Sequence, residues 1–170
     1  IIYGVSAFGL SQQTNLNSAE SKVLIESYYK TYPKLKNYIS EQISFARENG
    51  YVETILGRRR YLNNINSQNS IIRSADERNA VNSPIQGSAA DIIKLAMISI
   101  QKKITENNLK AKMLLQVHDE LIFEVPKNEL KRINNIIKEE MTSVVKSDLH
   151  SFSIPLTVDI NFGENWGILH

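Results

Sequence analysis

The 170-residue sequence has the composition of an ordinary globular protein, with 42% hydrophobic and 22% charged residues. It has no Cys and three His, which excludes disulfides, Cys-ligated zinc, thiol nucleophiles and His-rich metal sites. The formal net charge of +2 permits nucleic-acid binding without arguing for it, and no apolar run of about 18 residues is present to span a membrane. The first residue is Ile1 rather than Met, within an apolar run, so we expect a fragment of a longer protein.

The first part of the chain predicts two consecutive helices. Residues 1–16 are expected to finish one element and form a loop, after which Asn17 can cap a helix in a capping box with Glu20. Pro33 interrupts this helix, and a second helix follows with its apolar side chains along one stripe. Gly50 is expected to end the second helix as the residue just beyond it.

A hairpin and a short helix are predicted next. Segments 51–55 and 59–62 lie on either side of Gly57 and are typical of two short paired strands. The polar segment 63–70 predicts an exposed loop, and a short helix is expected over 71–80.

The second half predicts a long helix, a hairpin and a further helix. Ser83 and Pro84 are typical of an N-cap and a first helical position, so we expect the long helix to start there. Strands are predicted at 113–117 and 121–125, and an amphipathic helix at 128–146. A last strand is expected from the alternation of Leu156, Val158 and Ile160. The fold class is therefore α+β, mostly helical with a small antiparallel sheet.

The tip between the two later strands consists of His118, Asp119 and Glu120. A tight hairpin turn normally contains Asn-Gly or Asp-Gly, because the turn requires positive φ, and this tip has no Gly. Adjacent carboxylates at a strand end suit Mg²⁺, and in phosphoryl transfer two such ions about 4 Å apart steady the attacking and leaving oxygens. Two other interpretations stay open here: a solvated turn with ordinary surface acids, and the His-Asp dyad of phosphohydrolases, which lies on a helix and requires more His ligands.

Arg78, Asn82 and Gln86 follow one another at intervals of four residues, which gives them a common direction on a helix even with a kink at the expected helix start. Side chains of these types donate hydrogen bonds to base edges and phosphates. Arg and Gln can test the shape of a base pair through minor-groove acceptors that occur in every pair. The alternative is a capped helix whose polar residues face water.

Taken together, the segments resemble family A DNA polymerases. QVHDELIFEV (116–125) is similar to the third polymerase motif of that family, in the palm, and RNAVNSPIQGSAADIIK (78–94) resembles the segment before it. IIYGVSAFGL (1–10) looks like the close of the fingers motif, GYVETILGRRRYL (50–62) resembles the fingers hairpin, and GENWG (163–167) is also typical.

The resemblance implies a metal site and its substrates. Asp119 would bind the two catalytic Mg²⁺ ions of the intact enzyme, and Glu120 would assist them directly or through water. His118 would contact the primer strand near its 3′ end. The implied partners are primer-template DNA and deoxynucleoside triphosphates, with no membrane and no particular oligomer, in a bacterial cytoplasm or an organelle matrix.

The resemblance also implies contacts around the primer terminus. Arg78 and Gln86 would track the minor groove, with Asn82 beside the template or primer strand. Tyr3 would stack near the template base at the insertion site, and Gly4 would let the chain turn away there.

By the same resemblance, residues 1–83 would form a fingers segment, and residues 84–170 the long helix and a palm segment. The Arg, Lys and aromatic residue that begin the fingers motif are absent, and so is the metal-binding Asp of the first palm motif. We therefore expect the fragment alone to be inactive. The arginines at 58–60 could contact phosphate, although a solvated or ion-paired role is favoured.

Two other functions stay open from the sequence. One is a single-subunit RNA polymerase of the phage or mitochondrial type, although Glu120 and the segment 163–167 favour DNA. The other is a non-catalytic module that binds duplex DNA through Arg78, Asn82 and Gln86.

Overall fold

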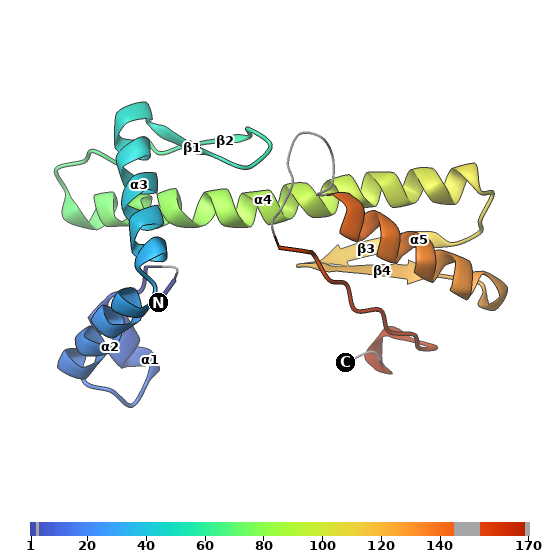
Figure 1. The fold of residues 1–170 in the computed structure, drawn as a ribbon, viewed down its shortest axis with the longest axis horizontal. Helices are drawn as coiled ribbons and strands as arrows, with labels where there is room; N and C mark the ends of the chain where they lie inside the picture. Colours follow the sequence, from blue (N-terminus) through green and yellow to red (C-terminus); the bar gives the residue numbers. More distant parts are fainter. Residues whose placement is uncertain (3, 145–153, 169–170) are drawn as a thin grey trace. The chain divides into compact units, whose positions relative to one another are not determined.

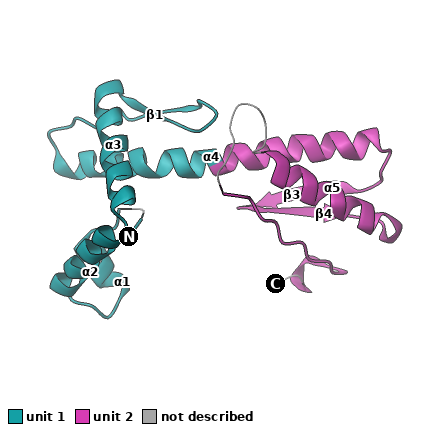
Figure 2. Cartoon of the chain, viewed as in Figure 1, with its two compact units in different colours: residues 1–88 teal, residues 89–170 magenta. Residues whose placement is uncertain are grey.

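The computed structural model describes residues 1–2, 4–144 and 154–168, which form two compact units, residues 1–88 and 89–170 (Figure 2). Unit 1 contains α1 (Ala7–Gln13), α2 (Ser18–Thr31), α3 (Pro33–Asn49), β1 (Tyr51–Glu53) and β2 (Arg59–Tyr61) (Figure 1). Helix α4 (Ser70–Glu106) contributes to both units. Unit 2 adds β3 (Lys112–Val117), β4 (Glu120–Glu124), the 3₁₀ helix η1 (Lys127–Glu129), α5 (Leu130–Ser143) and the 3₁₀ helix η3 (Trp166–Ile168). This confirms the predicted α+β class, and none of the described helices is long and apolar enough to cross a membrane.

The predicted ends of the first helices are confirmed. The Asn17 side chain accepts a hydrogen bond from the Glu20 amide at 2.9 Å, and the Glu20 carboxylate accepts one from the Asn17 amide at 2.8 Å, which completes the capping box. Pro33 opens α3, where its missing N–H has no helical partner to lose. Gly50 ends α3 with φ of +78°, a left-handed conformation that costs glycine little.

Residues 1–16 were expected to finish one element and form a loop, and the structure places the separate helix α1 within this segment. The Ser6 hydroxyl caps the helix by accepting a hydrogen bond from the Gly9 amide at 3.0 Å. Helix α1 is seven residues long and buries none of them, so no apolar stripe marks it in the sequence.

Strands β1 and β2 form the predicted hairpin, with Tyr51 opposite Tyr61 and Glu53 opposite Arg59. Between these pairs, Val52 faces inward and is 1% exposed. It joins a small core of buried side chains from α3, the hairpin, the following loop and α4. The other members of this core are Ala46, Leu62, Ile65 and Ala80.

The predicted helix break at Ser83 and Pro84 was wrong: α4 is continuous from Ser70 to Glu106, with Pro84 inside it. An interior proline removes one backbone hydrogen bond and costs about 3 kcal/mol. Side chains buried on both sides of Pro84, Val81 before it and Ser88 after it, anchor the helix within unit 1. The Ser88 hydroxyl also donates a hydrogen bond to the Pro84 carbonyl at 2.5 Å.

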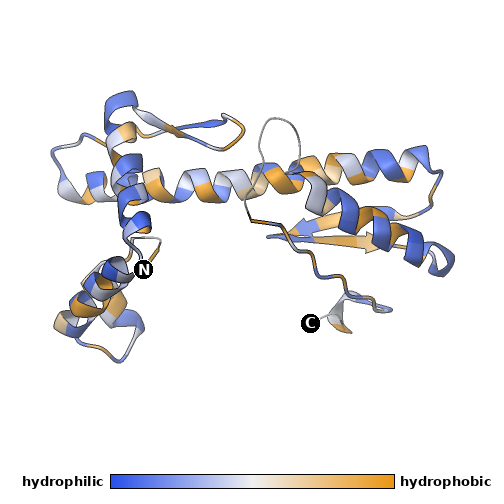
Figure 3. Ribbon diagram, in the orientation of Figure 1, coloured by the Kyte–Doolittle hydropathy of each residue, from blue (hydrophilic) through white to orange (hydrophobic). Residues whose placement is uncertain are grey.

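Unit 2 packs the end of α4 and helix α5 against the antiparallel hairpin β3–β4. Figure 3 shows the hairpin as largely hydrophobic and α5 as largely hydrophilic, as expected for an amphipathic helix that covers a sheet. The Ser99 hydroxyl of α4 donates a hydrogen bond to the Glu140 carboxylate of α5. The buried members of this core are Ile100, Ile104, Ala111, Ile133 and Ile137, with Met113, Leu121 and Phe123 packed against them.

Strand β3 contains one residue more than the facing part of β4, so the ladder between the two strands is irregular. Met113 pairs with Phe123 and Leu115 pairs with Ile122, which leaves Leu114 as an extra residue in a bulge. The irregularity therefore lies in the half of β3 that is remote from the tip.

The prediction of a last strand at 156–160 was wrong. Within the described residues, the segment 154–165 joins no ladder, although Ile160 packs against the unit 2 core. Alternating apolar residues indicate which side chains face a core, but a strand also requires a hydrogen-bonding neighbour. The end of the predicted helix 128–146 lies outside the described residues from position 145 onward.

Candidate nucleic-acid interface and carboxylate tip

The tip of the β3–β4 hairpin is a two-residue loop, because Val117 pairs with Glu120 and only His118 and Asp119 lie between them. His118 adopts φ of +51°, as the requirement for a tight turn predicts. A non-glycine residue in this conformation costs about 1–2 kcal/mol. The Gln116 side-chain amide donates a hydrogen bond to the His118 carbonyl at 2.8 Å, which supports the backbone of the tip.

Asp119 projects from this tip as an exposed side chain. Within the described part of the chain it takes part in no hydrogen bond and no ion pair, so its carboxylate oxygens are accessible to a cation. The neighbouring Glu120 is also exposed. Carboxylate oxygens at a strand end are the donors that Mg²⁺ prefers, and the tip residues therefore fit a part of a magnesium site.

The tip does not form a complete metal site by itself. Across the described residues, no group of three or more His, Cys, Asp or Glu side chains could hold a metal ion. Mg²⁺ requires about six oxygen ligands, which one or two carboxylates, water and substrate phosphates usually supply. Further ligands would have to come from a substrate, from water or from residues outside this arrangement.

Arg78, Asn82 and Gln86 lie on the unit 1 part of α4, which continues through all three positions. The helix is not broken between them, so the four-residue spacing places their side chains on a common side. Arg78 and Gln86 are exposed, whereas Asn82 is half-buried. The Asn82 side-chain oxygen is buried and accepts no hydrogen bond from the described residues, at a cost of about 1–3 kcal/mol.

Gly4 lies directly against one of these side chains. A Cβ atom added to Gly4 would lie 3.3 Å from the Arg78 Cγ atom. Gly4 has φ of +76°, and its amide donates a hydrogen bond to the Ile1 carbonyl at 2.9 Å, so the chain turns here. The predicted site residue Tyr3 lies outside the described residues.

The arginines of the first hairpin make intramolecular contacts. The Arg59 guanidinium donates to the Glu53 carboxylate at 2.7 Å and lies 4.3 Å from the centre of the Tyr51 ring. The hydrogen bond with Glu53 raises the pKa of Arg59 above its ordinary value. Arg58 donates to the Gly87 carbonyl of α4 at 3.1 Å. The ion pair of Arg59 with Glu53 agrees with the solvated or ion-paired role that the sequence favoured for these arginines.

A small hollow of about 90 Å³ lies between this hairpin and the part of α4 that carries the predicted site residue Gln86. Gln86 and Gly87 line it from the helix side, and Arg58 and Arg60 line it from the hairpin side. The sequence did not predict that the hairpin packs beside Gln86. The only local signal was the small residue that follows Gln86.

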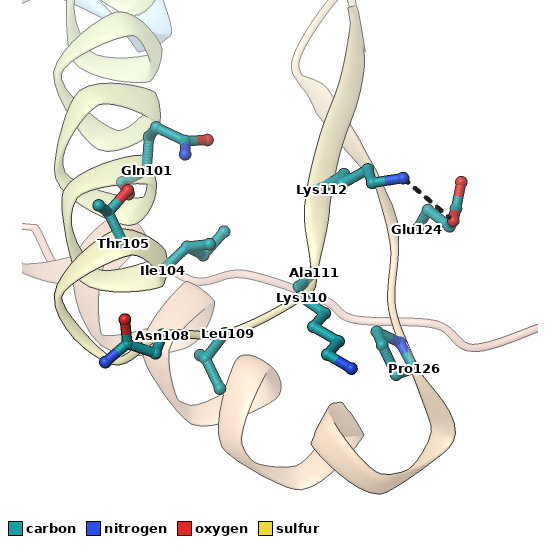
Figure 4. A pocket seen from close by; sticks show the side chains of 10 residues that line it. All are labelled: Gln101, Ile104, Thr105, Asn108, Leu109, Lys110, Ala111, Lys112, Glu124 and Pro126. Carbon is teal, nitrogen blue, oxygen red and sulfur yellow. Dashed lines mark hydrogen bonds and ion pairs between the residues drawn. The ribbon is translucent and has the colours of Figure 1, made fainter.

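A second, open hollow of about 800 Å³ lies within unit 2, at the opposite end of β3 and β4 from the tip (Figure 4). Lys112 and Glu124 line it and form an ion pair at 3.9 Å, drawn as a dashed line, and Leu109 and Pro126 contribute apolar surface. None of the predicted site residues lines this hollow. It is therefore separate from the carboxylate tip.

The predicted site residues thus fall into two groups, each described within its own unit. Unit 1 holds the α4 residues Arg78, Asn82 and Gln86 together with Gly4, and unit 2 holds the tip residues 118–120. The first group offers hydrogen-bond donors on one helix side, and the second offers carboxylates on a constrained turn.

Comparison with known proteins shows the family of this chain. The family model described as DNA polymerase family A matches residues 1–168. The chain is 45% identical over 98% of its length to DNA polymerase I of Caldicellulosiruptor bescii, and 46% identical over 98% to DNA polymerase I of Streptococcus pneumoniae serotype 4. It spans 19% and 18% of those two proteins. Among solved structures, it is similar to the POL domain of Pol1 from M. smegmatis in complex with DNA primer-template and dNTP. That match has 41% identity and a TM-score of 0.92, and covers 99% of this chain and 29% of the other.

Proposed function

This chain belongs to DNA polymerase family A, and we propose that it is the C-terminal part of an enzyme that extends a DNA primer on a template. The single observation that carries this proposal is the exposed Asp119 carboxylate on a strained two-residue tip, in the segment that resembles the palm motif of the family. The solved relative, whose title names primer-template DNA and dNTP, supports the same substrates for the whole protein.

The proposed reaction is phosphoryl transfer from a deoxynucleoside triphosphate. The primer 3′-hydroxyl attacks the α-phosphorus, the bond to the bridging oxygen breaks, and pyrophosphate leaves. Two Mg²⁺ ions, when bound, would stabilise the charge on the attacking and leaving oxygens. Asp119 would hold them together with a carboxylate from outside these 170 residues, and Glu120 would assist.

The remaining residues would position the nucleic acid. Arg78 and Gln86 would donate hydrogen bonds to minor-groove acceptors at the primer terminus, where such acceptors occur in every base pair. Asn82 would lie beside the template or primer strand, and His118 would contact the primer near its 3′ end. These roles are supported by the exposed donors on one side of α4 and by the motif that surrounds each residue.

The insertion site and the division into subdomains complete the proposal. Tyr3 would stack near the template base, and Gly4 would hold the chain's turn beside Arg78. Residues 1–83 would belong to the fingers, and residues 84–170 to the long helix and the palm. The contact between Gly4 and Arg78 supports a common site for the two segments of unit 1.

A primer-extension assay with the full-length polymerase that carries this chain tests the function. We expect extension with deoxynucleoside triphosphates and Mg²⁺, and much weaker extension with ribonucleoside triphosphates. Preferential use of ribonucleotides would instead support a single-subunit RNA polymerase. Tight binding of primer-template without any extension would support the non-catalytic DNA-binding module. The relatives named above are DNA polymerases, which favours the first outcome.

A further inference from the structure

The hairpin β1–β2 is fastened to α4 at the helical turn that carries Gln86. Five residues make this fastening, which we call the hairpin clamp: Thr54, Ile55 and Arg58 from the hairpin, and Gly87 and Ser88 from α4. The Ile55 amide donates to the Ser88 hydroxyl at 2.9 Å. Arg58 donates to the Gly87 carbonyl at 3.1 Å. The clamp lies wholly within unit 1.

Gly87 allows the closest approach in the clamp. A Cβ atom at this position would lie 2.6 Å from the Thr54 Cγ2 atom and 3.3 Å from an Arg58 guanidinium nitrogen. Thr54 is 9% exposed, so its methyl group has little room to move away. Glycine inside a helix costs about 1 kcal/mol relative to alanine. The closeness of the hairpin gives a physical reason for the glycine, since a backbone angle does not require it.

The clamp lies at the turn of α4 that follows Pro84. Pro84 has no N–H and interrupts the helical hydrogen bonding there. The Ser88 hydroxyl donates to the Pro84 carbonyl at 2.5 Å while it accepts the Ile55 amide, and Ser88 is 8% exposed. One buried hydroxyl therefore joins the helical turn that follows the proline to the hairpin. Gln86 lies between the two residues that this hydroxyl connects.

We propose that the hairpin clamp is a positioning device for Gln86, and that it determines how strictly the enzyme distinguishes a matched from a mismatched primer terminus. The inference rests on the proposed function, in which Gln86 donates to the minor groove at that terminus. A hydrogen-bond donor tests pair shape only if its backbone is held, because a displacement of about 1 Å can cost a hundredfold in rate. The clamp holds that backbone from the hairpin side.

The test compares four variants of the full-length polymerase. Gly87→Ala introduces the Cβ atom that meets Thr54, and Thr54→Ser removes the methyl group that it meets. The double variant Gly87→Ala/Thr54→Ser restores the room, and Gln86→Ala is the reference for loss of the donor. For each, kcat and KM for DNA are measured with matched and mismatched primer termini. Hydrogen exchange of the peptide that contains Ile55 reports the clamp itself.

We expect Gly87→Ala to lower the matched-to-mismatched ratio of kcat/KM by about tenfold to a hundredfold, and to speed exchange at Ile55. Thr54→Ser alone should behave as the wild type. The double variant should recover most of the discrimination, which a general loss of stability would not allow.

Three outcomes would overturn the inference in distinguishable ways. If Gln86→Ala still discriminates fully between matched and mismatched termini, the proposed role of Gln86 is wrong, and the clamp cannot act by positioning Gln86. If Gln86→Ala loses discrimination but Gly87→Ala does not, only the positioning role fails. If Gly87→Ala slows matched and mismatched extension equally and Thr54→Ser does not rescue it, the clamp is purely structural.

Discussion

Gly4 and Arg78 are in contact, since a Cβ atom on Gly4 would lie 3.3 Å from the Arg78 Cγ atom. The two residues belong to segments that the sequence marked independently, and the proposed function places one beside the insertion site and the other near the minor groove. Gly4 combines this close approach with φ of +76°, so any other residue would meet both backbone strain and the Arg78 stem. The contact lies at the Cγ atom of the Arg78 side chain, and Arg78 as a whole residue is exposed.

Replacement of Arg78 by Ala should weaken binding of primer-template DNA by about 1–3 kcal/mol and reduce the salt slope of binding by about one unit. The reason is the loss of one cation that contacts DNA, with release of its counterions. Fluorescence anisotropy over a range of salt concentrations measures both quantities. Lys102→Ala is a matched control, since it removes one exposed cation from the same helix. An equal effect of both variants would mean that Arg78 acts only through net charge.

Replacement of Asp119 by Asn in the full-length polymerase should reduce extension by roughly a thousandfold, which corresponds to several kcal/mol of lost metal-assisted catalysis. Binding of primer-template DNA should stay within about twofold of the wild type, because the exposed side chain supports no contact of the described fold.

Glu124→Gln serves as the control for Asp119→Asn, since Glu124 is an exposed carboxylate at the other end of the same hairpin. It should leave extension unchanged. If Asp119→Asn destroyed DNA binding or the fold, the residue would have a structural role in place of a metal-binding one.

The 170-residue chain alone should not extend a primer, even at high Mg²⁺ concentration. Its described residues contain no group of three or more side chains that could hold a metal ion, and by the family resemblance the chain would lack the Arg and Lys of the fingers motif. The assay uses purified chain, primer-template and deoxynucleoside triphosphates, with the full-length polymerase as the positive control. Extension above background would show that the tip suffices for catalysis.

Two substitutions at His118 should separate stability from function. His118→Gly should leave the free energy of unfolding unchanged or raise it, because glycine adopts φ of +51° without strain. His118→Val should lower it by about 1–2 kcal/mol, because a β-branched residue strongly disfavours this conformation. Both variants should impair primer extension, since both remove the imidazole. Full activity of His118→Gly would mean that the side chain makes no useful contact with the primer.

Truncation in the unit 2 core should destabilise the chain far more than truncation on its surface. Ile133 is 2% exposed, so Ile133→Ala should lower the free energy of unfolding by about 2–5 kcal/mol. Ile98 on α4 is 67% exposed, and Ile98→Ala should change it by less than about 0.5 kcal/mol. Urea denaturation followed by circular dichroism measures both. Similar losses would indicate that another surface covers Ile98.

Local signals in the sequence predicted most element ends correctly. The Asn17 capping box, the Gly50 helix end and the β3–β4 hairpin each depend on contacts between residues close in sequence. The positive φ at His118 followed from the same kind of argument, because a tight turn without glycine has few alternatives.

Features that depend on distant contacts were not predictable. The helix passes through Pro84 because side chains buried on both sides of it anchor α4. The alternation at 156–160 identified inward-facing residues and gave no information about a neighbouring strand. The contact between Gly87 and Thr54 joins residues 33 positions apart, and the glycine itself is its only local signal. The roles of the site residues stay predictions until the variants above are measured.

The bulge at Leu114 gives the two halves of β3 opposite phase. On a regular strand, Met113 and Gln116 would point to opposite faces of the ribbon, since they are three positions apart. Their partners Phe123 and Leu121 are two positions apart on β4 and share a face, so the extra residue Leu114 brings Met113 and Gln116 to the same face. The single extra leucine thus lets β3 follow the uninterrupted strand β4 from the hydrophobic interior to the acidic turn. Deletion of Leu114 would remove the extra residue and leave a regular ladder, in which Met113 and Gln116 keep their partners.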